Sequence, residues 1–242
     1  MKANKFQSYL IIVLSLLATL KTSLIALWMA YSKKHTRQDI DRLARAWAMR
    51  LLRIVKLNYK VSDPCQLHLD PNRNYVIVSN HVGNYDIPLI LVALPGSIRM
   101  MAKKVLFKVP IWGKAMRTSE FIPIDRENSK QAIQDLKYAK EKIKSGIILW
   151  IAPEGTRSTN NELRPFKKGA FVLARQTNAI IIPVGIQDSA KALPAKTLNF
   201  SVGETATIHI GKPIDSAQYK AADKDQLVKD VEESVRKVLS AE

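Results

Sequence analysis

An apolar run of 23 residues near the start of the sequence constrains this chain most. Residues 9–31 are YLIIVLSLLATLKTSLIALWMAY and carry one charged side chain, that of Lys21. A helix of this length is long enough to cross a bilayer, and so much apolar surface requires cover by lipid or by protein. Lys21 lies near the middle, where an ammonium group costs roughly 3 kcal/mol in a spanning helix.

Three membrane structures satisfy this pattern: a single span, a helix that dips into the bilayer with Lys21 reaching its surface, and two short helices that meet near residues 21–23. A buried core helix is the alternative without lipid. A cleaved signal peptide is disfavoured, because no small-residue cleavage site follows residues 10–20 and a second apolar run comes directly after them. We predict membrane association for this segment.

The chain is strongly basic, with 38 lysines and arginines against 21 acidic residues and a formal net charge of +17. Such a charge predicts anionic partners, namely nucleic acid, acidic lipid or phosphate-bearing substrates. If residues 9–31 span a membrane, the more basic flank stays in the cytoplasm. The following flank is the more basic one, with Lys33, Lys34 and Arg37 against Lys2 and Lys5. The predicted location is the inner membrane, with the rest of the chain facing the cytoplasm.

Residues 33–60 have the pattern of a basic amphipathic helix. Apolar side chains recur at three- and four-residue spacing, and arginines and a lysine occupy positions between them. With Trp47 on its apolar face, such a helix suits the interface of an anionic bilayer. The alternative is that the apolar face packs on the body of the protein and the basic face lies in solvent.

From about residue 57, short β-branched runs alternate with amphipathic helices. Strands are predicted at residues 75–78, 98–102, 121–124, 147–151, 179–186 and 205–210. Helices are predicted at residues 86–94, 106–116 with a break at Pro110, 128–145, 168–177 and 223–239. This alternation predicts an α/β fold with a mixed, largely buried sheet flanked by helices. We divide the chain into a membrane-associated helical region, residues 1–56, and a domain at residues 57–242.

The segment SNHVGNYDIP, residues 79–88, follows the first of these strands and leads into a helix. His81 and Asp86 are five residues apart and would point about 140° apart on one continuous helix. A turn at Gly83 and Asn84 would bring them together. The Asp86 carboxylate would then hold one imidazole nitrogen and leave the other free as a general base. The alternative is that Asp86 caps the helix and His81 is only a turn residue.

The segment IAPEGTRST, residues 151–159, follows the most apolar predicted strand. Gly155 allows the backbone to approach a ligand closely, Thr156 supplies a hydroxyl donor, and Arg157 suits a bidentate contact with phosphate. Glu154 is predicted to hold an arginine in place or to bond a substrate hydroxyl. The alternative is a surface turn with solvated charges.

Two further segments are EFIPIDREN, residues 120–128, and the apolar IIIPVGI, residues 180–186. Together the four segments, in this order and spacing, resemble the glycerolipid acyltransferases, whose prototype is 1-acylglycerol-3-phosphate (lysophosphatidate) acyltransferase. The blocks of that family are Asn-His-x4-Asp, an aromatic-Ile-x-x-Asp-Arg strand, Phe-Pro-Glu-Gly-Thr-Arg-Ser and an apolar strand with Pro. The resemblance covers roughly residues 57–215. Ala152, Gly83 and Ser119 differ from the usual Phe, Ser and Gly of the family, which concerns packing and acceptor fit.

The resemblance implies transfer of an acyl group from a thioester to the free hydroxyl of 1-acylglycerol 3-phosphate, which gives phosphatidic acid. His81, oriented by Asp86, would deprotonate that hydroxyl without a covalent enzyme intermediate. The donor would be acyl-CoA or acyl carrier protein, a co-substrate and not a cofactor. Another lysophospholipid or glycerol 3-phosphate is the alternative acceptor.

The same resemblance implies that Arg126 and Arg157 hold the phosphate of the acceptor and that Glu154 contacts its free hydroxyl. Lys103 and Lys104 lie in a stretch, residues 99–117, with six basic residues and no acidic one. They are candidates for a phosphate or donor contact, with a solvated face or an anionic-lipid contact as the alternatives.

Other function classes lack their sequence signals. No helix-turn-helix, zinc-ligand set or aromatic RNA-binding motif occurs, which argues against a nucleic-acid-binding protein. No Gly-x-Ser-x-Gly elbow supports a serine hydrolase. A single cysteine, Cys65, and four histidines without paired-ligand spacing predict neither a metal site nor a disulfide framework. The predicted partners are a lysophospholipid acceptor, the thioester donor and anionic membrane lipid.

Overall fold

The computed structural model describes residues 1–125, 129–157, 163–220 and 222–240. Its sheet has eight strands: β1 (Asn58–Ser62), β2 (Tyr75–Ser79), β3 (Ile98–Lys103), β4 (Ile122–Ile124), β5 (Ile148–Ile151), β6 (Ile180–Gln187), β7 (Thr205–Ile210) and β8 (Ile214–Asp215). The α-helices are α1 (Lys5–Ser32), α2 (Arg37–Ile54), α3 (Asp86–Ala93), α4 (Trp112–Thr118), α5 (Ser129–Lys144), α6 (Gly169–Gln176), α7 (Ser189–Ala192) and α8 (Lys224–Leu239). Single 3-10 turns occupy Lys104–Lys108 and Ser216–Gln218.

The strands follow the order β1-β7-β6-β2-β5-β3-β4, and β8 pairs with β6. Strands β6, β2, β5, β3 and β4 run parallel to their neighbours in that order, whereas β7 and β8 pair antiparallel with β6. The sheet is therefore mixed, as predicted. The carboxyl ends of the five parallel strands share one edge, where open α/β sheets place their ligands.

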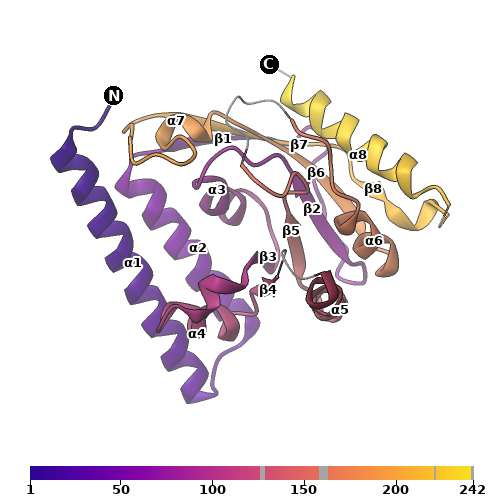
Figure 1. Ribbon diagram of the computed structural model, residues 1–242, viewed down its shortest axis with the longest axis horizontal. Coiled ribbons are helices and arrows are strands. Elements are labelled where there is room, and N and C mark those ends of the chain that lie inside the picture. The colour runs from indigo at the N-terminus through magenta and orange to yellow at the C-terminus, as the bar shows by residue number, and fades with distance from the viewer. Residues whose placement is uncertain (126–128, 158–162, 221, 241–242) are drawn as a thin grey trace.

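Two apolar cores lie on opposite faces of the sheet. Along β2, Tyr75 and Ile77 point into one core, and Val76 and Val78 point into the other, because successive side chains of a strand alternate between faces. Helices α1, α2 and α3 cover the first face, and α5, α6 and α8 cover the second (Figure 1). Burial on both faces explains why β2, β5 and β6 are continuous apolar runs.

The predicted strands and helices at residues 75–239 are present, with small shifts at their ends. The predicted break at Pro110 is also present, since a 3-10 turn ends at Lys108 and α4 begins at Trp112. Strands β1 and β8 were missed. Strand β1 is a mostly exposed edge strand, and β8 has only two residues, so neither carries the apolar pattern of a buried strand.

Helix α1 is one continuous helix without a break near residues 21–23, so the alternative of two short helices is wrong. One side of α1 is buried against α2 and α4, through Ile11, Ala18, Ser23 and Ala26. The other side exposes large apolar side chains, including those of Leu14, Leu16, Leu17, Leu20, Leu24 and Trp28. Among the described residues, α1 is the one helix long and apolar enough to cross a membrane.

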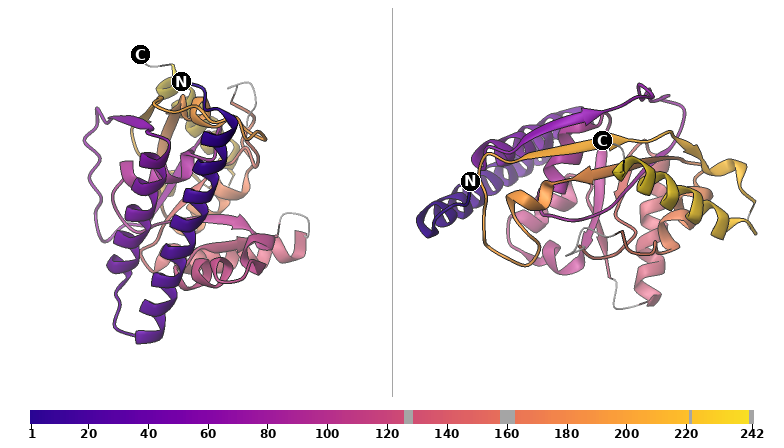
Figure 2. Two further views of the ribbon diagram at one scale, coloured as in Figure 1. Left: turned by 90° about the vertical axis from the view of Figure 1, so that its left-hand side faces the viewer. Right: turned by 90° about the horizontal axis from the view of Figure 1, so that it is seen from above.

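Helix α2 lies between α1 and α3 (Figures 1 and 2). Its apolar side packs on the body of the protein. Its buried Ala48 and Leu52 belong to the same apolar core as Ile77 of β2. Arg45 donates to the carbonyls of Leu91 and Leu94 at 2.9 and 2.7 Å, at the end of α3. Of the two alternatives for this basic amphipathic segment, the structure shows packing on the protein. The division at residue 56 stays a prediction.

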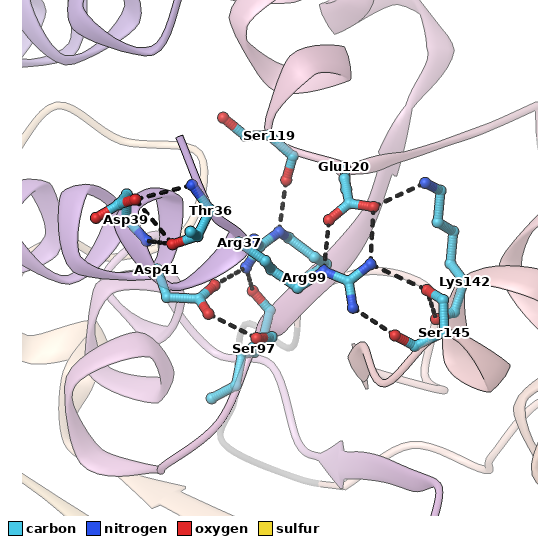
Figure 3. Close-up of polar contacts among 11 residues, drawn as sticks. Thr36, Arg37, Asp39, Asp41, Ser97, Arg99, Ser119, Glu120, Lys142 and Ser145 are labelled. Carbon is cyan, nitrogen blue, oxygen red and sulfur yellow. Dashed lines mark hydrogen bonds and ion pairs between the residues drawn. The ribbon is translucent and has the colours of Figure 1, made fainter. Parts of the chain in front are cut away.

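Charged side chains fasten the start of α2 to the turn before β4 and to α5 (Figure 3). Arg37 donates from Nε and Nη2 to the two carboxylate oxygens of Glu120, at 2.8 and 3.1 Å. Lys142 of α5 donates to the same carboxylate at 2.8 Å. Burial pushes the pKa of Glu120 upward, but the hydrogen bonds from Arg37 and Lys142 outweigh it and lower the pKa to about 2.

A second ion pair joins Asp41, one turn further along α2, to Arg99 (Figure 3). The side chain of Arg99 is fully buried. Asp41 accepts from Arg99 of β3 at 2.7 Å and from the hydroxyl of Ser97 at 2.5 Å. Arg99 also donates from Nε to the carbonyl of Ser119. A buried charge requires polar partners. The partners of Arg99 lie on α2 and in the turn before β4, so these two segments and β3 are held together.

Candidate active site

The loops that follow β2 and β5 lie side by side at the carboxyl edge of the sheet, because these two strands are parallel neighbours. Asn80 begins the first loop and is held by β6. Its side-chain amide donates to the carbonyl of Ile186 and accepts the backbone N–H of the same residue, both at 2.8 Å. This paired contact anchors the loop immediately before His81.

His81 and Asp86 are in contact, as expected if the chain turns between them. His81 Nδ1 lies 2.6 Å from Oδ2 of Asp86, which is the first residue of α3. The same oxygen accepts the backbone N–H groups of Val82 and Gly83 at 2.8 and 2.9 Å. Asp86 is fully buried, whereas the His81 side chain keeps 21% of its surface exposed. The carboxylate is therefore a fixed acceptor inside the protein, and the imidazole faces the outside.

This contact determines which nitrogen of His81 is available. A carboxylate at Nδ1 places the proton there and leaves Nε2 with a free lone pair. Among the described residues, no protein group bonds Nε2. The ring of Trp150 packs edge-on against the imidazole, with 5.8 Å between the ring centres. Trp150 is itself held by a 2.8 Å hydrogen bond to Ser79, so the imidazole is oriented on two sides.

Glu154, in the loop after β5, supports the His81 loop. Its Oε1 accepts the backbone N–H of His81 at 2.8 Å, and its Oε2 accepts that of Arg164 at 3.1 Å. The residue is only 4% exposed. Burial raises the pKa of Glu154, and the two backbone hydrogen bonds counteract this. Both oxygens of Glu154 bind backbone N–H groups and the side chain lies beneath the surface; its contact with a substrate hydroxyl stays a prediction.

Residues 155–157, which follow Glu154, lie closer to the surface. Gly155 has a positive φ of 77°, and a Cβ at this position would lie 2.8 Å from Nζ of Lys167, so the turn requires glycine. Thr156 is exposed. Arg157 donates to the side-chain oxygen of Asn84, two residues before Asp86. The predicted phosphate ligand thus lies beside the loop that carries His81.

Lys103 and Lys104 are exposed at the carboxyl end of β3. Strand β3 is two strands away from β2 in the sheet, a distance of roughly 10 Å. These lysines share the edge of His81 but make no hydrogen bond with the His81–Asp86 pair in the described part of the chain. Arg126 lies outside the described residues, and the strand before it, β4, ends at the same edge.

Two apolar cavities border α1 near this edge. One, of about 230 Å³, is lined by Leu16, Asn84, Tyr85 and Phe200, among others, and therefore touches the loop of the His81–Asp86 pair. The other, of about 170 Å³, lies between α1, α2 and α4 and includes Trp47 and Ile87. Thr19 lines both cavities and accepts a 3.0 Å hydrogen bond from Nε1 of Trp47.

Among the described residues, no group of three or more histidine, cysteine or acidic side chains is arranged to hold a metal ion. Sequence reasoning missed the contacts of Trp150 and of Ser189, whose hydroxyl donates to Asp86. Both residues are far from the motif in sequence, and neither belongs to a recognisable spacing.

Comparison with known proteins identifies a family and a fold for this chain. Residues 58–187 match the acyltransferase family model, which is more than half of the chain. The chain is 34% identical over 187 residues to the 1-acyl-sn-glycerol-3-phosphate acyltransferase of Saccharomyces cerevisiae, covering 76% of this chain and 60% of that protein. It is 34% identical over 174 residues to the human 1-acyl-sn-glycerol-3-phosphate acyltransferase beta, covering 71% and 61%.

A chloroplastic 1-acyl-sn-glycerol-3-phosphate acyltransferase of Brassica napus is 32% identical over 162 residues, which are 63% of this chain and 47% of that protein. The chain thus spans about half to three fifths of these relatives. The fold matches the crystal structure of PlsC, the 1-acyl-sn-glycerophosphate acyltransferase of Thermotoga maritima. The TM-score is 0.83 at 23% identity, over 97% of this chain and 94% of that one. On its sequence match, this chain belongs to the acyltransferase family.

Proposed function

We propose that this protein transfers an acyl group from a thioester to the free hydroxyl of 1-acylglycerol 3-phosphate and so forms phosphatidic acid. The observation that carries the proposal is the contact of His81 Nδ1 with the buried carboxylate of Asp86, which leaves Nε2 free at the sheet edge. Relatives named for this reaction support the choice of acceptor. Another lysophospholipid or glycerol 3-phosphate is the alternative acceptor.

The geometry leads to a direct transfer. Nε2 of His81 takes the proton of the acceptor hydroxyl while the oxygen attacks the carbonyl carbon of the thioester. The C–S bond then breaks, and the thiolate of the donor takes the proton back from the imidazolium. Asp86 stabilises the positive charge that His81 carries in between. No enzyme nucleophile is required, and neither a metal nor a resident cofactor enters these steps.

We place the acceptor phosphate next to Arg157. Its guanidinium group is held beside the His81 loop by Asn84, and a planar fork of N–H donors suits phosphate oxygens. Thr156 is exposed next to it and adds a hydroxyl. Arg126 is a second phosphate ligand in this proposal. Lys103 and Lys104, at the same sheet edge, are assigned to the phosphates of coenzyme A or the acidic surface of acyl carrier protein.

The two apolar cavities beside α1 are suitable for acyl chains. Their linings are almost entirely apolar, and the larger one reaches Asn84 and Tyr85 in the His81 loop. Burial of each methylene of an acyl chain contributes about 0.8 kcal/mol. We propose that acyl chains enter along α1, because its exposed apolar side adjoins the cavity.

We further propose that α1 holds the protein on a membrane without crossing it. The packed side of α1 extends from Ile11 to Ala26, about 22 Å of a helix that is about 42 Å long. The part of α1 that is not packed against protein is shorter than the roughly 30 Å of a bilayer core. An interfacial helix buries the exposed leucines in lipid, and Lys21, which is exposed among them, reaches the headgroups.

The proposed location is the cytoplasmic face of the inner membrane. Lys33 and Lys34 lie at the end of α1 and add positive charge there, which suits anionic lipid. Arg37, predicted to contribute to the same flank, is instead bound by Glu120. Coenzyme A and acyl carrier protein are soluble donors, so a site that opens beside an interfacial helix has access to both substrates.

A thiol-release assay on the purified protein tests the proposed function. Acyl-CoA and acyl carrier protein thioesters are each paired with 1-acylglycerol 3-phosphate, glycerol 3-phosphate and a lysophospholipid without a terminal phosphate. We expect the fastest release with 1-acylglycerol 3-phosphate and phosphatidic acid as the lipid product. Faster turnover of another acceptor would assign the protein to that substrate, and thiol release that needs no acceptor would indicate a thioesterase.

A further inference from the structure

We propose that Ser189 is a positioning residue of the site, and that its hydroxyl holds the Asp86 carboxylate in the rotation that serves His81. This inference rests on the proposed function. Ser189 lies outside residues 58–187 that match the family model, and no sequence motif identifies it. It is the first residue of the short helix α7, which follows β6.

The two oxygens of the Asp86 carboxylate have different partners. Oδ2 accepts from Nδ1 of His81 and from the backbone N–H groups of Val82 and Gly83. Oδ1 accepts from the hydroxyl of Ser189, the one donor that the described residues supply to it. Asp86 and Ser189 are both fully buried. Without the hydroxyl, a buried carboxylate oxygen loses its partner, and such groups are paired in native structures.

The backbone brings Ser189 to this position by an unusual conformation. Asp188, immediately before it, has a positive φ of 65°, which a residue with a Cβ rarely adopts. Gly83 adjoins the hydroxyl: a Cβ there would lie 3.3 Å from Oγ of Ser189. A bridge between Gly83 and Pro194 fastens the segment after α7 to the same loop. The left-handed turn at Asp188 thus directs Ser189 at the carboxylate.

The consequence for catalysis concerns rotation of the carboxylate. Rotation about the Cβ–Cγ bond of Asp86 would exchange the two oxygens or tilt them away from the imidazole. Three donors on Oδ2 resist this on one side, and Ser189 resists it on the other. Catalysis is sensitive to small errors in such geometry. Within the described residues, Ser189 makes no hydrogen bond with His81, so its effect on the imidazole passes through Asp86.

The test compares Ser189→Ala with Ser216→Ala in the full-length protein. Ser216 is equally buried and donates its hydroxyl to the carbonyl of Ala179, at the amino end of β6 and so at the sheet edge opposite the site. We expect kcat to fall about ten- to a hundredfold in Ser189→Ala, the effect of one charge-assisted hydrogen bond. The KM values for both substrates should stay unchanged, and Ser216→Ala should keep the wild-type kcat.

Two further variants separate positioning from a structural role. In an Asp86→Ala background, Ser189→Ala should cause no additional loss, because its partner is already absent. Ser189→Cys fills the same space with a weaker donor and should have an intermediate kcat. Wild-type kcat in Ser189→Cys or Ser189→Ala, or a full additional loss in the Asp86→Ala background, would overturn the proposal.

His81→Ala, measured in parallel, keeps this test distinct from that of the proposed function. If His81→Ala is inactive and Ser189→Ala is as active as Ser216→Ala, only the role of Ser189 is refuted. If His81→Ala keeps wild-type activity, the general-base mechanism itself is refuted. Should Ser189→Ala not fold, the kcat of Ser189→Cys decides the question.

Discussion

Oε1 of Glu154, in the loop after the neighbouring strand β5, accepts the backbone N–H of His81 at 2.8 Å. The glutamate of the Pro-Glu-Gly turn therefore holds the general base through its main chain, while Asp86 holds it through its side chain. The two acidic residues closest to His81 have different tasks. One determines where the residue lies, and the other determines which nitrogen carries the proton.

Glu154→Gln tests the positional role. An amide keeps the volume of the side chain but presents an NH2 group to one of the two backbone N–H donors, so one hydrogen bond is lost. We expect a decrease in kcat of about ten- to a hundredfold and a destabilisation of about 1–3 kcal/mol. Steady-state kinetics and urea unfolding measure the two effects.

Glu232→Gln is the matched control, because Glu232 also accepts a backbone N–H, that of Phe166, but lies on α8. Its kcat should equal that of the wild type. If Glu154→Gln instead changes only the acceptor KM, the carboxylate contacts substrate and the assignment to the backbone is wrong.

His81→Ala and Asp86→Asn should abolish or strongly reduce acyl transfer without unfolding the protein. Loss of a positioned general base costs on the order of 10² to 10⁴ in rate. The rate of acyl transfer should decrease nearly as much in Asp86→Asn, because an amide can bind the wrong imidazole tautomer. Thiol release measures the rate, and the thermal midpoint shows that each variant is folded. A folded His81→Ala protein with wild-type turnover would contradict the mechanism.

Arg157→Lys should raise the KM for the acceptor about ten- to a hundredfold, because lysine keeps the charge but loses the planar fork. The KM for the thioester should change little. Arg175→Lys serves as the control, since Arg175 donates to the carbonyl of Tyr219 on the far side of the sheet. With a neutral lysolipid as acceptor, Arg157→Lys and wild type should not differ. An increase confined to the donor KM would assign Arg157 to the thioester.

The ion pair of Arg37 with Glu120 should make stability depend on pH. The pKa of Glu120 is lowered from 4.5 to about 2, so the carboxylate stabilises the fold fully above pH 4.5 and loses this contribution as pH falls toward 2. Glu120→Gln should therefore be less stable by about 1–2 kcal/mol near neutral pH, after allowance for partial solvent screening. Urea unfolding at about pH 7, 4 and 3 should show this difference shrinking with acidity. A difference that is constant with pH would exclude the linkage.

The exposed side of α1 should control membrane binding. A variant with Leu17, Leu20 and Leu24 changed to Gln keeps the buried side of the helix, which deletion of residues 1–31 would remove together with its packing. We expect most of the variant protein to stay unbound in the presence of vesicles that contain anionic lipid. The small bound fraction should decrease as the salt concentration rises. Sedimentation with vesicles measures the bound fraction. The control changes three exposed apolar residues elsewhere: Val61, Ile133 and Leu198. Equal binding of both variants would show that α1 is not the anchor.

The features that the sequence determined are local or periodic. The alternation of apolar strands and helices is visible in any window of about ten residues, and it predicted the α/β class and most elements of the sheet. His81 and Asp86 are five residues apart, so one turn with Gly83 is enough to join them. The apolar length of residues 9–31 likewise follows from the chain alone.

Tertiary structure decided which distant residues meet. Glu154 is 73 residues from His81, and Ser189 is 103 residues from Asp86. These contacts exist because β5 and β6 flank β2 in the sheet, an order that no local pattern encodes. The same applies to α1, whose sequence is apolar on all sides. Only packing against α2 and α4 separates its buried side from the side left to lipid, because the energy of burial depends on the neighbour and not on the segment alone.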